Sequence, residues 1–353
     1  MSNSLQPNPA EGKRKMAFSY VTLAHGGGGF QTERLLGEVV FPIVMAEEDA
    51  TMDDSVILDE QPGGRLAFTT DSFIVAPLFF PGGDIGRLAV AGTVNDLAVV
   101  GAMPLWISLS LILEEGLEIE QLKAICRSIR ATADEARVKI VTGDTKVVER
   151  GKGDGCYINT AGIGRVIREP PPSLANARPG DSVIVSGTIG DHGAAVVAQR
   201  QMLALDSPVR SDVAPLGAML NALVEQFGSA IRTLKDPTRG GLAMACHDIA
   251  EASGVQIELD EAAIAVRREV HAICDLLGFD VLEVANEGKA AIVCAADAAR
   301  AVVEFLARFE AGKHASLAGR VASTDRPLVV LRTRIGGERL VAKPVGEILP
   351  RIC

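Results

Sequence analysis

The chain has 353 residues, a formal net charge of −10, and a composition that is 48% hydrophobic but only 4% aromatic. This length allows two domains with separate cores, and the composition is that of a globular protein. An acidic chain without a basic cluster is poorly suited to nucleic acid or to an anionic membrane, and no apolar run is long enough to span a bilayer. We therefore expect no nucleic-acid or membrane partner, and an anionic substrate such as a nucleotide would need bridging cations.

The N-terminal segment and the cysteines bear on cellular location. Residues 1–17 carry charges without an apolar stretch behind them, so we expect a flexible leader and not a signal peptide. The six cysteines are widely scattered and form no CxxC pair, which argues against a disulfide framework and against a zinc site. Such cysteine usage is typical of the reducing cytosol, and we expect a cytoplasmic protein.

The first half begins with two strand-like stretches, residues 55–60 (SVILDE) and 65–75 (RLAFTTDSFIV), which the turn QPGG separates. Apolar residues recur at helical spacing in residues 117–138 and predict a helix there. Cys126 lies beside this apolar stripe, so we expect it in the core. Residues 138–145 (VKIVTGDT) are typical of a strand that runs into a loop.

Three consecutive prolines in residues 168–181 (REPPPSLANARPGD) predict a linker, because proline interrupts helices and central strands. The second half continues with a strand, a glycine-rich turn and a helix in residues 181–203, and with a later helix that ends at Gly254. Residues 290–296 (AAIVCAA) predict a buried strand, and Asp297 is placed to cap the helix that follows. The mixed order favours two domains of the α/β class (α+β type).

The sequence ends with PRIC, so that Cys353 is its last residue. A free cysteine on a frayed end is one interpretation, since chain ends are often poorly ordered. A fully extended chain reaches roughly 3.3–3.6 Å per residue, so the last 15 residues or so could also carry the thiol across a domain into a pocket. We divide the chain into a leader (1–17), an N-terminal domain (18–170), a C-terminal domain (171–340) and a mobile tail (341–353).

Aspartates recur where apolar strands are expected to give way to loops, in MDDSVIL, FTTDSFIV, GTVNDLAVVG, VTGDTKVV and LKDPTRGGL. Each has a structural explanation. Asp96 and Asp236 could cap the helices that follow them, and Asp71 and Asp144 could stabilise turns. Five similar positions favour a shared function, because Mg²⁺ is usually held by carboxylates together with substrate phosphates. An acidic protein could bind a triphosphate in this way.

Two glycine-rich segments could bring backbone N–H groups close to phosphates: HGGGGF, with Gly26 to Gly29, and FFPGGDIG, with Gly82 and Gly83. Surface turns use the same residues. No GxxxxGK[ST] or GxGxxG sequence follows a strand, so the sequence predicts neither a P-loop nor a Rossmann fingerprint.

Three polar segments remain. Lys146 follows Asp144 by two residues and could contact an anion or simply be solvated. In VANEGKAAIVC, Glu287 precedes a buried strand, and burial in a closed site would raise its pKa and suit it to proton transfer. In GTIGDHG, we expect His192 to serve a turn or a helix cap. The histidines show no metal-ligand spacing, and no GxSxG serine motif is present.

Several of these segments together resemble one family. TTDSFIV, FFPGGDIG, GTVNDLA, TGDTKVV, DPTRGGL, NEGK and the final PRIC are similar to the HypE family of hydrogenase maturation proteins, the carbamoyl dehydratases. The resemblance covers about residues 20 to 353. It extends more weakly to the aminoimidazole ribonucleotide synthetase superfamily, which includes selenophosphate synthetase and thiamine-monophosphate kinase.

The resemblance implies a two-domain aminoimidazole ribonucleotide synthetase-like fold whose N-terminal domains pair in a homodimer, with ATP and Mg²⁺ bound at the dimer and domain interface. It implies that the terminal cysteine receives a carbamoyl group from the carbamoyltransferase HypF. ATP then drives the dehydration of this group to a thiocyanate, whose cyanide passes to iron on the HypC–HypD complex. Cys353 would then be a mobile arm.

The resemblance also implies roles for particular residues. The catalytic residues would be Cys353, Lys146, which would stabilise the thiocarbamate oxygen or the transferred phosphoryl group, and Glu287, which would take protons from nitrogen. The ATP-binding residues would be Asp71, Thr93, Asn95, Asp96, Gly143, Asp144, Lys146, Gly82 and Gly83. The metal ligands would be Asp53, Asp54, Asp71, Asp96, Asp144 and Asp236, with the choice between Asp53 and Asp54 left open.

Two alternatives belong to other classes of function. The chain could be another ATP-dependent phosphotransferase of the superfamily, similar to selenophosphate synthetase or thiamine-monophosphate kinase. Selenophosphate synthetases carry a reactive cysteine followed by lysine near the N-terminus, whereas the first cysteine here is Cys126. The chain could instead be a non-enzymatic chaperone that presents Cys353 to a partner or a metal, although the aspartates and glycine segments argue against it.

Overall fold

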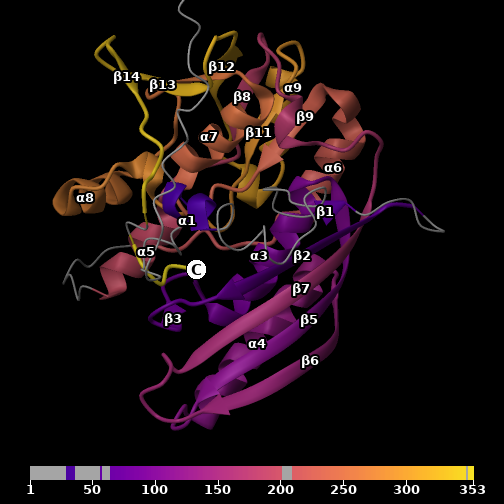
Figure 1. The fold of residues 1–353 in the computed structure, drawn as a ribbon, viewed down its shortest axis with the longest axis vertical. Helices are drawn as coiled ribbons and strands as arrows, with labels where there is room; N and C mark the ends of the chain where they lie inside the picture. Colours follow the sequence, from indigo (N-terminus) through magenta and orange to yellow (C-terminus); the bar gives the residue numbers. More distant parts are fainter. Residues whose placement is uncertain (1–28, 36–55, 58–63, 201–208, 347–348) are drawn as a thin grey trace, which may run out of the picture.

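The structure, a computed structural model, describes residues 29–35, 56–57, 64–200, 209–346 and 349–353. Two mixed sheets with their helices form its two halves, and the C-terminus lies at the level where the halves meet (Figure 1). The first sheet comes from residues before the proline-rich segment 168–181 and the second from residues after it. This organisation places the last residues of the chain against both halves.

Among the described residues the first sheet has the strand order β1-β2-β7-β5-β6, with β5 parallel to β6 and the other neighbours antiparallel. A short hairpin, β3 and β4, leads into its first large helix. The elements are β1 (Val56–Ile57), β2 (Leu66–Phe73), β3 (Phe79–Phe80), β4 (Gly83–Asp84), α3 (Ile85–Val99), β5 (Ala102–Glu114), α4 (Ile119–Ala136), β6 (Lys139–Val148) and β7 (Cys156–Val166).

Helices α3 and α4 cover one face of this sheet. Helix α3 is apolar on nearly all sides and is correspondingly buried, and the Asp84 carboxylate caps it by accepting from the N–H groups of Gly86 and Arg87. On the other face, Phe68 and Trp106 are paired to the same residue of β7, and their side chains are 40% and 44% exposed. A row of large apolar side chains on a sheet face is typical of a surface that another protein covers.

The second sheet has the strand order β14-β13-β10-β12-β8-β11-β9 in the described part of the chain. Alternate residues of its central strands face opposite clusters: Val183 and Val293 pack toward α7, whereas Ile184 and Ile292 pack toward α6 and α9. Helices on both faces explain why these strands are apolar throughout. The strands are β8 (Ser182–Val185), β9 (Ile231–Lys235), β10 (Gln256–Asp260), β11 (Ala291–Cys294), β12 (Ser316–Ala322), β13 (Leu328–Arg332) and β14 (Glu338–Leu340).

The remaining α-helices and the short 3₁₀ turns surround these sheets. The helices are α1 (Phe30–Leu35), α5 (Asp191–Arg200), α6 (Gly217–Phe227), α7 (Gly241–Ser253), α8 (Arg268–Leu277) and α9 (Ala299–Leu306). The 3₁₀ turns are η3 (Leu174–Asn176), η4 (Gly228–Ala230), η5 (Val281–Glu283) and η6 (Glu310–Gly312). None of the described helices combines the length and apolar character that a membrane crossing needs.

Several predicted elements are confirmed. The strand in residues 65–75 is β2, the helix in 117–138 is α4, and the strand in 290–296 is β11. Gly254 ends α7 in the left-handed conformation at φ 66°, as a C-terminal glycine commonly does. The described part of the strand predicted in residues 55–60 is β1.

Other predictions were wrong. Cys126 is exposed, because it lies beside the buried stripe of α4 and not within it. Asp297 does not cap α9, whose N-cap is Ala298. Residues 142–145 continue strand β6 and do not form a loop.

The predicted common placement of the aspartates at strand ends was also wrong. Asp71 lies within β2, Asp144 within β6 and Asp96 within α3. Asp236 directly follows β9, but it does not cap α7, whose N-cap is Gly240. The apolar stretch before Asp96 is a buried helix, and a short apolar run does not distinguish such a helix from a strand.

Candidate active site

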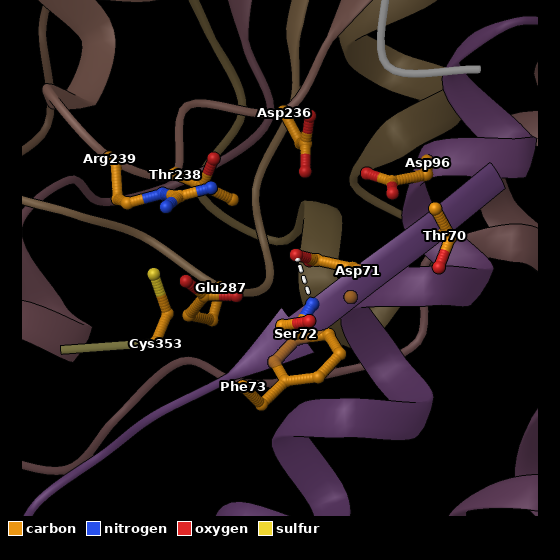
Figure 2. A pocket seen from close by; sticks show the side chains of 11 residues that line it. Thr70, Asp71, Ser72, Phe73, Asp96, Asp236, Thr238, Arg239, Glu287 and Cys353 are labelled. Atoms are coloured by element: carbon orange, nitrogen blue, oxygen red, sulfur yellow. Dashed lines mark hydrogen bonds between the residues drawn. The ribbon is translucent and has the colours of Figure 1, made fainter. Parts of the chain in front are cut away.

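A cavity of about 340 Å³ lies between the two halves of the molecule and reaches the end of the chain. Figure 2 shows Cys353, Glu287 and Arg239 toward one side of the cavity, and Asp71, Asp96 and Asp236 toward the other. Its wall is formed by Thr70, Asp71, Ser72, Phe73, Gly92, Asp96, Asp236, Thr238, Arg239, Glu287 and Cys353. A thiol, a buried carboxyl group, a guanidinium group and three carboxylates therefore share one cavity.

The three carboxylates come from separate elements. The Asp71 carboxylate, on β2, accepts from the Ser72 N–H at 2.8 Å, and the Asp96 carboxylate, on α3, accepts from the Thr69 hydroxyl at 2.9 Å. Asp236 directly follows β9 and lies on the same side of the cavity as the other two (Figure 2). Among the described residues, no three histidine, cysteine or acidic side chains are close enough to enclose a metal ion. Carboxylates spread along an open wall fit a Mg²⁺ ion that is shared with substrate phosphates, and they do not form an all-protein metal site.

Glu287 lies in the turn before β11 and is 3% exposed. Its backbone N–H donates to the Asp212 carboxylate at 3.1 Å, and its carbonyl accepts from the Asn95 amide at 3.4 Å. The Oε1 atom of its side chain is buried without a hydrogen-bond partner among the described residues. A buried acceptor without a partner is costly, so a group that reaches this atom from the cavity would be well bound.

The environment of Glu287 favours its protonated form. Burial is the largest cause that raises the pKa of Glu287 well above its usual range, and the neighbouring charges of Asp236, Asp212 and Asp71 act in the same direction. The Arg239 guanidinium opposes them. Perturbed carboxyl groups of this kind occur at sites of proton transfer, because their pKa lies nearer to the working pH.

The last residues of the chain are docked and not frayed. Ile352 is 2% exposed, and its carbonyl accepts a hydrogen bond from the His192 ring at 2.7 Å. The Arg200 guanidinium donates to the carbonyls of Ala76, Pro350 and Arg351. These contacts fix the backbone on both sides of Ile352 and direct the Cys353 side chain into the cavity (Figure 2).

Comparison with known proteins agrees with this arrangement. The family model "AIR synthase related protein, N-terminal domain" matches residues 52–166, and the corresponding C-terminal domain model matches residues 178–332. The carbamoyl dehydratase HypE of Rhizobium leguminosarum bv. viciae is 45% identical over 97% of this chain and 98% of its own. This chain belongs to the HypE family.

Solved HypE structures have the same fold as this family member. A crystal structure of a HypE–HypF complex matches with a TM-score of 0.83 and 45% identity, over 88% of this chain and 99% of that one. A HypE crystal structure in complex with ATP matches with a TM-score of 0.80 and 43% identity, over 94% of this chain and 99% of that one. The predicted two-domain aminoimidazole ribonucleotide synthetase-like fold of the α+β type is confirmed.

Lys146 and Asp144 do not line the cavity of this HypE family member. They lie on β6, where their side chains are 69% and 59% exposed, and their charged groups contact each other at 2.6 Å. The Lys146 hydrogen bond lowers the pKa of Asp144. The alternation of a strand explains the contact, since residues two apart share one face.

The sheet keeps this pair away from the cavity within one chain. Asp71 and Gly143 belong to one row of paired residues that crosses the sheet through Thr160 and Leu109. Three strand spacings separate the ends of this row, which corresponds to roughly 14 Å. Gly143 therefore does not reach the cavity that Asp71 lines, and Lys146 lies at the far edge of the same sheet.

The other residues assigned to ATP are near the site but do not line it. Thr93 and Asn95 are buried in α3, where Thr93 contacts the Thr160 hydroxyl and Asn95 accepts from the N–H of Leu216. Gly82 and Gly83 lie against residues 211 and 213. Asp53, Asp54 and the glycines at 26–28 lie outside the described residues.

Several residues of the cavity wall were not predicted from the sequence. Thr238 and Arg239 follow Asp236 in DPTRGGL, and the segment was interpreted only through its aspartate. Thr70 and Ser72 flank Asp71 on β2. An arginine two residues after a strand-end proline, in a chain that must bind phosphate without a P-loop, was the available signal for Arg239.

Proposed function

We propose that this chain dehydrates a carbamoyl group bound to the Cys353 sulfur, using ATP, and produces an enzyme-bound thiocyanate. The cyanide would serve as ligand for the iron of a [NiFe]-hydrogenase. The observation that carries the proposal is the placement of the Cys353 thiol in one cavity with Glu287 and three aspartates. A chaperone that only presents a thiol would not need a buried carboxyl group beside it.

The net reaction is the loss of water from the carbamoyl group, coupled to the cleavage of ATP to ADP and phosphate. The carbamoyl oxygen attacks the γ-phosphorus, the bond to ADP breaks, and one N–H proton is removed, which leaves an O-phosphorylated imidate on sulfur. The C–O bond then breaks as the second N–H proton is removed, so that phosphate leaves and S–C≡N remains. Phosphorylation is required because the unmodified oxygen is a poor leaving group.

Glu287 is the base in this scheme. Its carboxyl group is buried beside the position of the thiol-bound group, and its raised pKa makes it a stronger base than an exposed glutamate. Its turn precedes the buried strand β11, which holds the carboxyl group in place. The Arg239 guanidinium faces the same space and would offset the charge of the transferred phosphoryl group.

Asp71, Asp96 and Asp236 would hold Mg²⁺ together with the phosphates of ATP. Bound there, the ion would neutralise the phosphate charge and orient the γ-phosphoryl group. The spread of these carboxylates along the wall supports an ion shared with the nucleotide. Asp53 or Asp54 would complete the set from the N-terminal segment.

Lys146 and Asp144 would act on the cavity of a second subunit. Roughly 14 Å of sheet separates β6 from the cavity in their own chain, whereas the row of Phe68 and Trp106 offers an apolar face for pairing of N-terminal domains. A homodimer built on this face would place ATP at the dimer and domain interface. Asp144, Gly143 and Lys146 would then contact the partner's nucleotide.

The remaining assignments concern partners and place. HypF would load the carbamoyl group, and the solved HypE–HypF complex of similar proteins supports this partnership. The HypC–HypD complex would accept the cyanide, and the reaction would occur in the cytoplasm. The whole-chain identity to carbamoyl dehydratases does not favour the selenophosphate synthetase-like or thiamine-monophosphate kinase-like alternative.

Intact mass spectrometry tests the proposal. The protein is carbamoylated with HypF and carbamoyl phosphate, freed of nucleotide by desalting, and then given either ATP or a non-hydrolysable ATP analogue. We expect a carbamoyl adduct that loses one water with ATP and is retained with the analogue. Cys353→Ala should form no adduct, whereas Cys126→Ser, which removes the exposed cysteine, should behave as the wild type. An adduct that forms and never loses water would leave only the chaperone.

A further inference from the structure

His192 contacts the peptide group that joins Ile352 to Cys353. Its Nε2 atom lies 2.7 Å from the Ile352 carbonyl oxygen, and because a carbonyl can only accept, Nε2 carries the proton. The Nδ1 atom lies 2.8 Å from the Ser211 hydroxyl oxygen. In a neutral ring Nδ1 must accept, so the hydroxyl donates to it. The hydrogen bonds thus run in one direction, from Ser211 through His192 to the tail.

The ring has little freedom to leave this position. His192 is fully buried, and its ring packs against the Phe80 ring in a T-shaped arrangement, with ring centroids 5.3 Å apart and an interplanar angle of 89°. Burial is the largest cause that lowers the pKa of His192, which keeps the ring neutral. The imidazole is therefore a fixed connection between Ser211 and the tail backbone, one bond away from the residue that carries the thiol.

Ser211 is itself held by the hairpin before α3. Its N–H donates to the Pro81 carbonyl at 2.7 Å, and its hydroxyl oxygen accepts from the Val213 N–H at 3.1 Å. Gly82 has φ +100°, and a Cβ atom there would lie 2.7 Å from both the N and the O atom of Ser211. Glycine is required here by close approach and by conformation, which gives Gly82 a structural role beside Ser211.

The next residue, Asp212, binds the turn that carries Glu287, the proposed base. Its carboxylate accepts from the N–H groups of Glu287 and Gly288 at 3.1 and 3.3 Å, and it pairs with the Lys289 ammonium at 3.3 Å. A Cβ atom on Gly288 would lie 1.9 Å from the Asp212 carbonyl oxygen, so the two backbones are in direct contact. Of these two adjacent residues, Ser211 therefore contacts the histidine that binds the tail, and Asp212 contacts the turn that carries Glu287.

We infer that Ser211 and Asp212 form a positioning element that sets Cys353, through His192, and Glu287, through its turn, in one register. This inference rests on the proposed function. Small errors in the separation of reacting groups reduce rates strongly, and a shared anchor removes the independent motion of two loops. In this scheme Ser211, Asp212 and His192 do not contact the reacting atoms. Each of them acts through the group that it binds.

The first test measures docking of the tail and does not need the reaction. In a Cys126→Ser background, iodoacetamide labels the half-buried Cys353 in preference to the buried cysteines, and intact mass gives the rate. His192→Asn keeps an amide near Ser211 but cannot reach Ile352, and loss of one such bond should speed labelling about fivefold. His192→Gln reaches the carbonyl and should restore a rate close to that of the wild type.

Matched pairs separate positioning from general destabilisation. Ser253 also accepts one backbone N–H and donates to one carbonyl, those of Ala177 and Leu174, so Ser253→Ala is the control for Ser211→Ala. Asp181 is similarly buried and accepts from a backbone N–H, so Asp181→Asn is the control for Asp212→Asn. We expect faster labelling in Ser211→Ala alone among these four.

The second test measures the single-turnover loss of water from carbamoylated protein at saturating ATP. His192→Asn, Ser211→Ala and Asp212→Asn should each slow it about tenfold, with ATP affinity unchanged and with His192→Gln close to the wild type. Equal labelling rates in His192→Asn and His192→Gln, or equal losses in Ser211→Ala and Ser253→Ala, would overturn the inference. If the labelling differences occur but wild-type protein never loses water, the docking of the tail by Ser211 and His192 is supported and the proposed function is wrong.

Discussion

Two short segments of this chain, NEGK at residues 286–289 and GDTK at residues 143–146, carry the same kinds of side chain and reach opposite environments. Glu287 is 3% exposed inside the cavity, whereas the Lys146 side chain is 69% exposed on strand β6. The first lies where two halves of one chain meet, and the second lies at the edge of a sheet. The comparison teaches that a charged motif indicates chemistry, but only its surroundings show whether one chain completes the site.

The electrostatics of the two segments differ for the same reason. Glu287 is surrounded by protein and by other carboxylates, which raise its pKa. Asp144 contacts Lys146 in solvent, and this hydrogen bond lowers the pKa of Asp144. Exposed ion pairs of this kind contribute little to stability, so the GDTK pair is better explained by a ligand or a partner than by the fold of its own chain.

The largest expected effect is at the buried segment. Glu287→Gln removes the proposed base while its amide keeps the shape of the side chain, and water loss from the carbamoylated protein should slow at least about a hundredfold. Isothermal titration should show unchanged ATP affinity. Glu283→Gln is the matched control, because Glu283 is nearby, also has a raised pKa and does not line the cavity. Wild-type rates in Glu287→Gln would remove the assignment.

Mixed dimers test whether the exposed segment serves another chain. Homodimers of Lys146→Ala and of Cys353→Ala should each be inactive. In Lys146→Ala the rate of water loss should fall about a hundredfold or more if the lysine stabilises the transferred group. A mixture after subunit exchange should regain activity, because one subunit supplies Cys353 and the other Lys146. The rate of water loss at increasing ratios of the two variants measures this. A mixture as inactive as its components would place Lys146 in its own chain's reaction or outside the reaction.

The pH dependence of the reaction should follow Glu287. A base works in its deprotonated form, so the rate of water loss should rise as the pH passes through the raised pKa of Glu287 and then level off. Single-turnover rates measured as a function of pH check this. The residual rate of Glu287→Gln should lack the rise, and the same rise in that variant would assign it to another group.

The pH dependence of stability should separate the two segments by a smaller effect. Glu287 has a raised pKa in the folded state. Its contribution to the free energy of unfolding is therefore fully present below the unfolded pKa and is lost as the pH rises through the folded pKa. As the pH rises above the ordinary glutamate value of 4.5, the melting temperature of Glu287→Gln should therefore fall less than that of the wild type. If the melting temperatures of the variant and the wild type change in parallel with pH, burial does not raise the pKa of Glu287.

The smallest expected effect is on the stability of the exposed pair. Lys146→Ala should leave the melting temperature unchanged within error, since surface ion pairs are worth little. The same measurement on the mixed-dimer samples provides the control that activity losses do not come from unfolding. A clear loss of melting temperature would show that β6 depends on this pair for its own packing.

The sequence allowed much of the fold to be predicted where periodicity was strong. Helix α4 follows from its apolar spacing, and its C-terminal neighbour β6 from its apolar and β-branched residues. Short apolar runs were less informative. The stretch before Asp96 was interpreted as a strand end and is the middle of the buried helix α3, because burial on all sides removes the periodicity that distinguishes the two.

The sequence by itself determined the list of reactive groups: a thiol at Cys353, a carboxyl group in NEGK and aspartates in five segments. Only the tertiary structure decided which of them meet. Glu287 and Cys353 are 66 positions apart and share a cavity, whereas Asp71 and Gly143 lie in one row and are kept apart by two strands. Ser211 and Asp212 carry no motif, and their role arises from hydrogen bonds across the fold, which local sequence does not encode.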